Sequence, residues 1–135
     1  MMLLRDMFGD EIWHPTGRFA AVVIDDPQLV PKFGYLDFAQ LLAQTDRDGF
    51  AASVAFIPFN RWRTRRATAD LFVRRPDRLS LCIHWCDHTS REFGIRDLAT
   101  LREMAHAARQ RMDSHRLRSG VNCDDVMVFP QGVFS

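Results

Sequence analysis

The sequence has little of what marks a disulfide-stabilised or a membrane-spanning protein. It contains only three cysteines, an odd number, and Cys82 and Cys86 lie close together in the chain. This usage argues against a disulfide framework and for a reducing compartment. No stretch approaches the ~20 consecutive apolar residues that a membrane-spanning helix needs. The apolar start is also too short for a secretory signal. We therefore expect a cytoplasmic protein with no membrane partner.

An excess of charge of one sign is missing as well. The formal net charge is +1, from 18 basic and 17 acidic residues, so overall electrostatics gives no reason to expect a nucleic-acid partner. Lys32 is the only lysine, which we interpret as codon bias. Repeats, low-complexity tracts and flexible linkers are absent too. We expect one domain over residues 1–135, with a lead-in at 1–18.

Apolar runs alternate along the chain with stretches of helical periodicity. The runs predict buried strands at 19–24, 51–57, 79–84 and 126–129, and the periodic stretches predict helices at 36–45, 64–74 and 95–115. We expect Thr64 to cap the second helix and His115 to interact with the dipole at the end of the third. The alternation predicts an α/β fold with about four parallel strands and three helices, in a sheet or barrel with right-handed crossovers.

Ionisable pairs stand at the carboxyl ends of two of these strands. Asp25 and Asp26 end the first strand, and His84 ends the third, with His88 following shortly after. Functional groups of such folds gather at the carboxyl ends of the strands. Two histidines and a carboxylate are a common ligand set for a catalytic divalent ion that keeps one position for water. The two pairs therefore indicate a metal-dependent hydrolytic site.

The spacing within each pair refines this hypothesis. Residues four apart lie roughly 13 Å apart along a strand but about 5–6 Å apart on a helical turn, so His88 should turn back toward His84. Pro27 favours an extended Asp26, which directs the carboxylates of Asp25 and Asp26 to opposite faces and into different roles. The structural alternatives are a hydrogen-bonded histidine pair and an ordinary Asp-Asp turn.

Taken together, these residues resemble the first two motifs of the polysaccharide deacetylase family, the NodB-homology group, over about residues 19–135. The resemblance implies a partial (β/α) barrel of the deacetylase type. It implies that Asp25 is the general base and that Asp26, His84 and His88 bind a divalent metal ion, with zinc the first expectation. The reaction implied is metal-assisted hydrolysis of an N-acetyl or other non-peptide carbon–nitrogen bond in a carbohydrate or small-molecule substrate.

The chain departs from the family pattern at several places. Pro27 and Gln28 replace the family's Gly-Pro, Trp85 replaces a Ser or Thr, and Phe129 stands where the third motif has Arg. The later motifs, which carry an orienting acid and an acid histidine, have no counterpart. We therefore expect an incomplete barrel, from a longer protein or a truncated reading frame, whose unpaired edge favours homo-oligomers. The alternative function is a non-catalytic metal-binding or assembly fragment of the same fold.

Two further patterns have competing interpretations. Cys82, His84, Cys86 and His88 alternate as in a zinc knot, but so short a segment cannot easily surround one ion, so we interpret Cys82 as a core residue. The arginine-rich run 61–66, which contains Trp62, is either a solvated loop or a surface for phosphate, sugar or base. Because the run follows a strand, it can lie at the same end of the strands as the expected metal site. A nucleic-acid module is a third interpretation, disfavoured by the balanced charge.

Overall fold

The computed structural model describes residues 22–89, 94 and 97–129. The lead-in at 1–18 and the start of the first predicted strand lie outside this range. Pro130 and Gly132, the residues of the family's third motif that the chain retains, lie outside it as well. Four strands form one parallel sheet in the order β1-β4-β5-β6. They are β1 (Val22–Asp25), β4 (Ala52–Phe56), β5 (Leu79–His84) and β6 (Cys123–Val128). The predicted α/β class with four parallel strands is confirmed.

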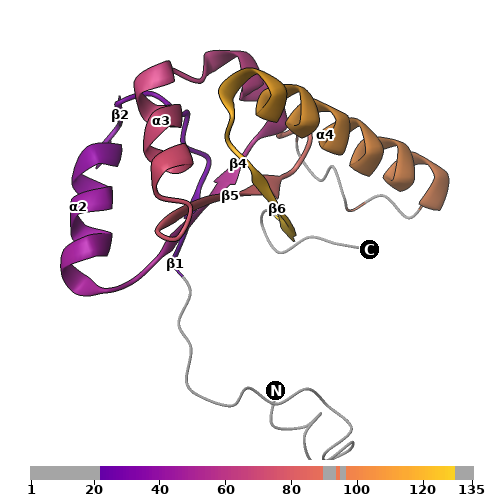
Figure 1. Cartoon of the computed structure of the whole chain (residues 1–135). Helices are drawn as coiled ribbons and strands as arrows, with labels where there is room; N and C mark the ends of the chain where they lie inside the picture. The colour runs from indigo at the N-terminus through magenta and orange to yellow at the C-terminus, as the bar shows by residue number, and fades with distance from the viewer. Residues whose placement is uncertain (1–21, 90–93, 95–96, 130–135) are drawn as a thin grey trace, which may run out of the picture.

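Helices connect successive strands, as the alternating pattern predicts (Figure 1). They are α2 (Phe38–Asp48), the 3-10 helix η2 (Pro58–Arg63), α3 (Arg66–Arg74) and α4 (Leu98–Ser119). A small antiparallel pair, β2 (Lys32–Phe33) and β3 (Leu36–Asp37), precedes α2. The helix predicted from residue 36 therefore begins later, because the Asp37 carboxylate accepts hydrogen bonds from the backbone N–H groups of Ala39 and Gln40 and caps it.

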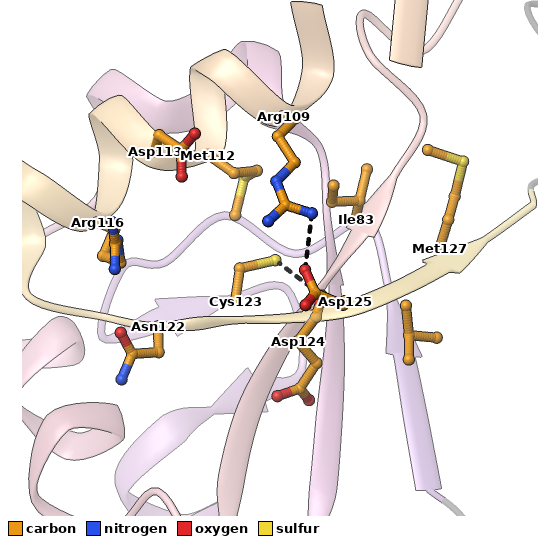
Figure 2. A pocket seen from close by; sticks show the side chains of 11 residues that line it. Ile83, Arg109, Met112, Asp113, Arg116, Asn122, Cys123, Asp124, Asp125 and Met127 are labelled. Atoms are coloured by element: carbon orange, nitrogen blue, oxygen red, sulfur yellow. Dashed lines mark hydrogen bonds and ion pairs between the residues drawn. The ribbon is translucent and has the colours of Figure 1, made fainter. Parts of the chain in front are cut away.

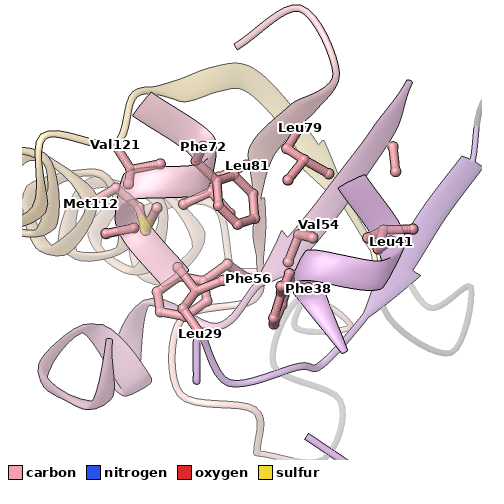
Figure 3. Packing of buried hydrophobic residues seen from close by; sticks show 12 residues of the cluster. Leu29, Phe38, Leu41, Val54, Phe56, Phe72, Leu79, Leu81, Met112 and Val121 are labelled. Carbon is pink, nitrogen blue, oxygen red and sulfur yellow. The ribbon is translucent and has the colours of Figure 1, made fainter. Parts of the chain in front are cut away.

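The main cluster of buried apolar side chains lies on one face of the sheet and meets all three α-helices there (Figure 3). The strands contribute Val54, Phe56, Leu79 and Leu81, and the helices contribute Phe38, Leu41, Phe72 and Met112. Successive strands stand side by side in chain order, without a reversal. Because every α-helix covers the same face, all three crossovers run in the same direction across the sheet.

Two predictions about Thr64 and His115 are wrong. Arg65, not Thr64, precedes the first turn of α3, and the Thr64 hydroxyl instead lies 2.8 Å from Nε2 of His115. His115 is fully buried against the ring of Phe56. Burial lowers the pKa of His115 to about 4, so the ring is neutral at pH 7 and supplies no charge to the helix dipole. Helix α4 also continues past it, to Ser119.

The last strand is longer than the sequence predicts. It begins at Cys123 rather than at 126, although Asp124 and Asp125 have low strand propensity. Both acids are exposed, and among the described residues β6 is an edge strand of the sheet. Charged side chains are tolerated on an edge strand. In the part of the chain that the structure describes, no helix is both long enough and apolar enough to cross a bilayer.

Candidate metal centre

Three predicted ligands converge at the carboxyl ends of β1 and β5. The Oδ1 atom of Asp26 lies 3.1 Å from Nε2 of His84 and 3.2 Å from Nε2 of His88. One ligand atom from each residue lies within 4.8 Å of the other two. The predicted convergence of these three side chains, called the triad below, is confirmed. His84 ends β5 and His88 lies in the turn that follows, as the spacing of the histidines predicts.

Unusual backbone angles bring the triad together. Among the described residues, the non-glycine positions with positive φ are Asp26 (66°), Trp85 (60°) and His88 (63°). A positive φ is uncommon for such residues and costs of order 1 kcal/mol or more each. The extended Asp26 expected before Pro27 is therefore wrong. Instead, the chain turns directly after β1, and the Asp26 carboxylate meets β5 across the intervening strand β4.

A backbone carbonyl fixes the orientation of the His84 ring. Nδ1 of His84 lies 3.0 Å from the carbonyl oxygen of Val128, the residue opposite His84 in the β5–β6 pairing. A carbonyl oxygen can only accept, so Nδ1 carries a proton, and Nε2 is the ring nitrogen that remains to bind a metal. Metal-binding histidines usually hold their second nitrogen in this way. No local pattern in the sequence indicates this contact, because strand pairing creates it.

The surroundings of Asp26 fit a metal ion. Its Oδ1 atom is buried and forms no hydrogen bond, although both Nε2 atoms are near. A buried carboxylate oxygen without a partner is costly. Tetrahedral zinc, with bonds of about 2.0–2.2 Å, places its ligand atoms about 3.3 Å apart, close to the distances observed. The two nitrogens and one oxygen suit zinc and several other divalent transition metals.

The triad combines a buried side with an open side. The His84 side chain is 3% exposed, whereas those of Asp26 and His88 are 46% and 41% exposed. Metal sites that act on substrates keep one coordination position open to solvent, unlike structural sites. The exposure of Asp26 and His88 provides such a side.

Asp25 does not belong to the triad. It is exposed at the end of β1, opposite Ala55 of β4. Burial raises the pKa of the Cys82 thiol, and the carboxylates of Asp124 and Asp25 raise it further. Asp25 is thus near enough to Cys82 to act on it electrostatically. Cys82 and His84 share one face of β5, which is the face away from the helices.

The cysteines take no part in the triad. Cys82 is buried, and its thiol lies within hydrogen-bond reach of the Val54 carbonyl oxygen, which confirms its assignment to the core. Cys86 is buried as well, and its sulfur accepts a hydrogen bond from a guanidinium nitrogen of Arg111 at 3.1 Å. Among residues 22–89, 94 and 97–129, the group of potential metal ligands contains no cysteine.

Arg111 of α4 holds the turn over residues 85–88. Its guanidinium donates to the carbonyl oxygen of Cys86 at 3.2 Å and forms an ion pair with Asp87. Asp87 immediately precedes the ligand His88, so α4 anchors the segment on which His88 stands. Arg111 could not be identified from the sequence, because a contact over such a distance along the chain leaves no local pattern.

Trp85 occupies the inner side of the same turn. Its ring is 2% exposed and packs against the ring of His88, with centroids 5.3 Å apart. The contact limits the positions that the His88 ring can adopt. Trp85 therefore supports the ligand geometry by packing, at a position where the family that the sequence resembles has a small hydroxyl residue.

A hollow of about 400 Å³ between α4 and β6 lies apart from the triad (Figure 2). None of the triad residues lines it. Figure 2 shows Arg109 extending from α4 to Asp125 on β6, where they form an ion pair at 2.8 Å. The thiol of Cys123 also lines this hollow, and burial raises its pKa to about 12. The thiol is therefore protonated at pH 7 and is not a nucleophile.

Comparison with known proteins adds no family assignment. No protein-family model, no curated protein and no solved structure gives a significant match to this chain.

Proposed function

We propose that the chain binds a divalent metal ion through Asp26, His84 and His88, with zinc as the first candidate, and that this centre hydrolyses a non-peptide carbon–nitrogen bond. One observation carries the proposal. Three ligand atoms from two strands and a turn meet at distances suited to a shared ion, while the buried Oδ1 of Asp26 has no hydrogen bond. The same oxygen lies 3.1 and 3.2 Å from the Nε2 atoms of the two histidines, so a bound ion would take the place of protons between them.

The fold supports the resemblance to polysaccharide deacetylases. Strands in unreversed order with every α-helix on one face are the arrangement of a barrel wall, whereas doubly wound sheets reverse their strand order. We infer a partial (β/α) barrel in which the second face of the sheet is the inner one. N-acetylated carbohydrates are accordingly the first substrate class to test.

The residues of the chain would divide the chemistry as follows. Asp26, His84 and His88 hold the ion, which when bound acidifies a water molecule toward a pKa of ~7 and polarises the substrate carbonyl. Asp25, on the face of the sheet that also bears His84, accepts the proton of the attacking water. The Val128 carbonyl keeps His84 in the required tautomer, and Trp85 and Arg111 hold the 85–88 turn.

Metal analysis of the purified chain tests the first half of the proposal. We expect one zinc ion per chain after reconstitution and dialysis, and loss of tight binding in His88→Ala. The matched control is His106→Ala, which removes an exposed histidine of α4 that contacts the side chain of Gln110 and not a triad residue. Equal zinc content in His88→Ala and in the unchanged chain would contradict the assignment.

Release of acetate from N-acetylated oligosaccharides tests the second half. We expect turnover that requires both the metal and Asp25. The alternative, a non-catalytic metal-binding domain of the same fold, is favoured by one observation: Asp25 is not among the converging groups. Stoichiometric metal without any turnover, in a chain that remains folded, would establish this alternative.

A further inference from the structure

A cationic and aromatic surface adjoins the triad. Helix η2 follows β4 at the same edge of the sheet as the ligands, and the backbone N–H of Phe59 donates to the carbonyl oxygen of Cys86 at 3.1 Å. Helix η2 therefore lies directly against the 85–88 turn. It exposes two large aromatic side chains, Phe59 at 55% and Trp62 at 63%. Exposed aromatic rings next to a reactive centre are typical of ligand-binding surfaces.

The ring of Trp62 packs against two arginines that are far from each other in the sequence, Arg61 and Arg118. The guanidinium carbon of Arg61 lies 5.1 Å from the centroid of the indole ring, and that of Arg118, from α4, lies 4.5 Å from it. Both distances are typical of cation–π contacts. Trp62 and Arg118 also line a shared open depression, together with Leu117 and Asp113. The packing of α4 on η2 thus creates a site that neither segment has alone.

Neither of these two arginines forms an ion pair with an acid among the described residues. Other arginines form ion pairs within the described residues, such as Arg66 with Asp70 and Arg109 with Asp125. A guanidinium packed against a ring still has N–H donors at its edge, in a fork that matches carboxylate, sulfate or phosphate oxygens.

We propose that Arg61, Trp62 and Arg118 form a subsite for the acidic substituent of a glycan, such as a uronate carboxylate, whose reacting unit lies at the triad. The substrate class rests on the proposed function, while anion binding at the subsite does not. An acidic glycan fits because the exposed Phe59, which is hydrogen-bonded through its backbone to the 85–88 turn and precedes Trp62 on the same helix, offers an apolar surface to a sugar ring. Nucleic acid fits less well, because two guanidiniums already pack over the indole ring on which a base would stack, and the net charge is only +1.

Binding titrations with defined probes test this subsite. We expect the full chain to bind an oligogalacturonate at least about tenfold more tightly than a neutral chito-oligosaccharide of equal length, since two charge-assisted contacts are gained. The double variant Arg61→Gln/Arg118→Gln should abolish this difference. Trp62→Ala should weaken oligogalacturonate binding, and Trp62→Phe should restore most of it. The control Arg47→Gln/Arg102→Gln removes the same charge from exposed sites elsewhere and should retain full affinity.

Several results would overturn the proposal. One is equal affinity for the acidic and neutral oligosaccharides. Another is an equal loss of oligogalacturonate affinity in the control and test double variants, when circular dichroism shows that both are folded. Inorganic phosphate binding as tightly as oligogalacturonate would remove the glycan from the assignment. Tighter binding of oligodeoxythymidylate, abolished by the same double variant, would identify a nucleic-acid surface instead.

The same titration separates this subsite from the metal centre. We expect the affinity for oligogalacturonate to stay unchanged in the presence of a chelator and in His88→Ala, because the arginines and the triad bind different groups. If zinc binding fails while anion binding persists, only the proposed metal function is wrong. If zinc binds and acetate is released but the acidic and neutral probes bind equally, only the subsite is wrong.

Discussion

His84 and Val128 face each other across the β5–β6 pair, and Nδ1 of His84 lies 3.0 Å from the Val128 carbonyl oxygen. This contact connects the buried metal ligand to the last strand of the sheet. It also selects the tautomer that leaves Nε2 free to bind a metal. The strand pairing that builds the fold therefore also prepares the ligand.

The tautomer of His84 can be measured directly. We expect long-range ¹H–¹⁵N spectra to show a proton on Nδ1 of His84 both in the metal-free chain and with zinc bound. Addition of zinc should then shift the Nε2 resonance of His84 and leave the His106 signals in place. A protonated Nε2 in the neutral His84 ring would contradict the donor role assigned to Nδ1.

The two histidine ligands should differ in their contribution to stability. His84 is almost fully buried, whereas 41% of the His88 side chain is exposed. We expect His84→Ala to lower the free energy of unfolding of the metal-free chain by about 2 kcal/mol, because a buried side chain is lost. His88→Ala should lower it by less than about 0.5 kcal/mol. Both variants should lose tight zinc binding. Urea unfolding with and without zinc measures both effects.

Arg111 should affect metal affinity without contacting the metal. It holds the turn of His88 through Cys86 and Asp87, and loss of such supporting contacts typically lowers metal affinity about 10–100-fold. We expect this loss in Arg111→Gln and a partial recovery in Arg111→Lys. Zinc titration of the variants, with a competing chelator, measures the change.

The control for Arg111 comes from the same helix. Arg109→Gln removes an exposed ion pair with Asp125 and does not touch the turn, so zinc affinity should remain unchanged. A merely structural role of Arg111 would lower the stability of the metal-free chain and leave the zinc dissociation constant of the folded chain as it is. That result would exclude the positioning role.

The sequence was informative where local patterns decide the structure. The strand at 79–84 has the predicted bounds, because its apolar run is long and ends at His84. The meeting of Asp26 with the histidines followed from the topology, since parallel strands bring their carboxyl ends to one edge. Local conformation was harder to predict. Pro27 favours an extended backbone at Asp26. Asp26 has a positive φ instead, and its side chain lies against His84.

Long-range partners could not be predicted at all. His115 and Thr64 lie on different elements, and their contact arises only once α4 packs on η2. The contact of Arg118 with Trp62 has the same origin. A helical pattern shows that a residue faces inward, but not which side chain it meets there. The two wrong predictions for Thr64 and His115 are thus one missed contact.

Buried His115 should make stability depend on pH. Its pKa is about 4 in the folded chain, against an ordinary value of 6.5, because burial disfavours the charged ring. Between these values the unfolded chain binds the proton and the folded chain does not, so stability falls as the pH falls. The loss should begin below about pH 6.5 and reach roughly 3 kcal/mol near pH 4, at 1.36 kcal/mol per pKa unit.

The comparison that isolates His115 is a neutral variant. His115→Gln cannot gain a proton in this range, so its stability should vary less between pH 6.5 and pH 4. Urea unfolding of the unchanged chain and of His115→Gln is measured with a chelator present. His84 and His88 then contribute equally to the stability of both proteins. Identical pH profiles for the two chains would show that His115 is not the group responsible.

The acidic pair offers the sharpest separation of ligand from base. The Oδ1 of Asp26 meets both histidines, whereas Asp25 lies outside the triad, at the exposed end of β1. We expect Asp26→Asn to lose zinc affinity by at least about 100-fold, since a neutral amide replaces an anionic ligand. Asp25→Asn should keep the zinc and lose at least about 100-fold in hydrolytic rate, because an amide cannot accept the proton of the attacking water.

Zinc content and acetate release, measured on the same preparations, separate the two roles. Loss of zinc in Asp25→Asn with retention in Asp26→Asn would reverse the assignment. Retention of zinc and rate in Asp25→Asn would require a different base.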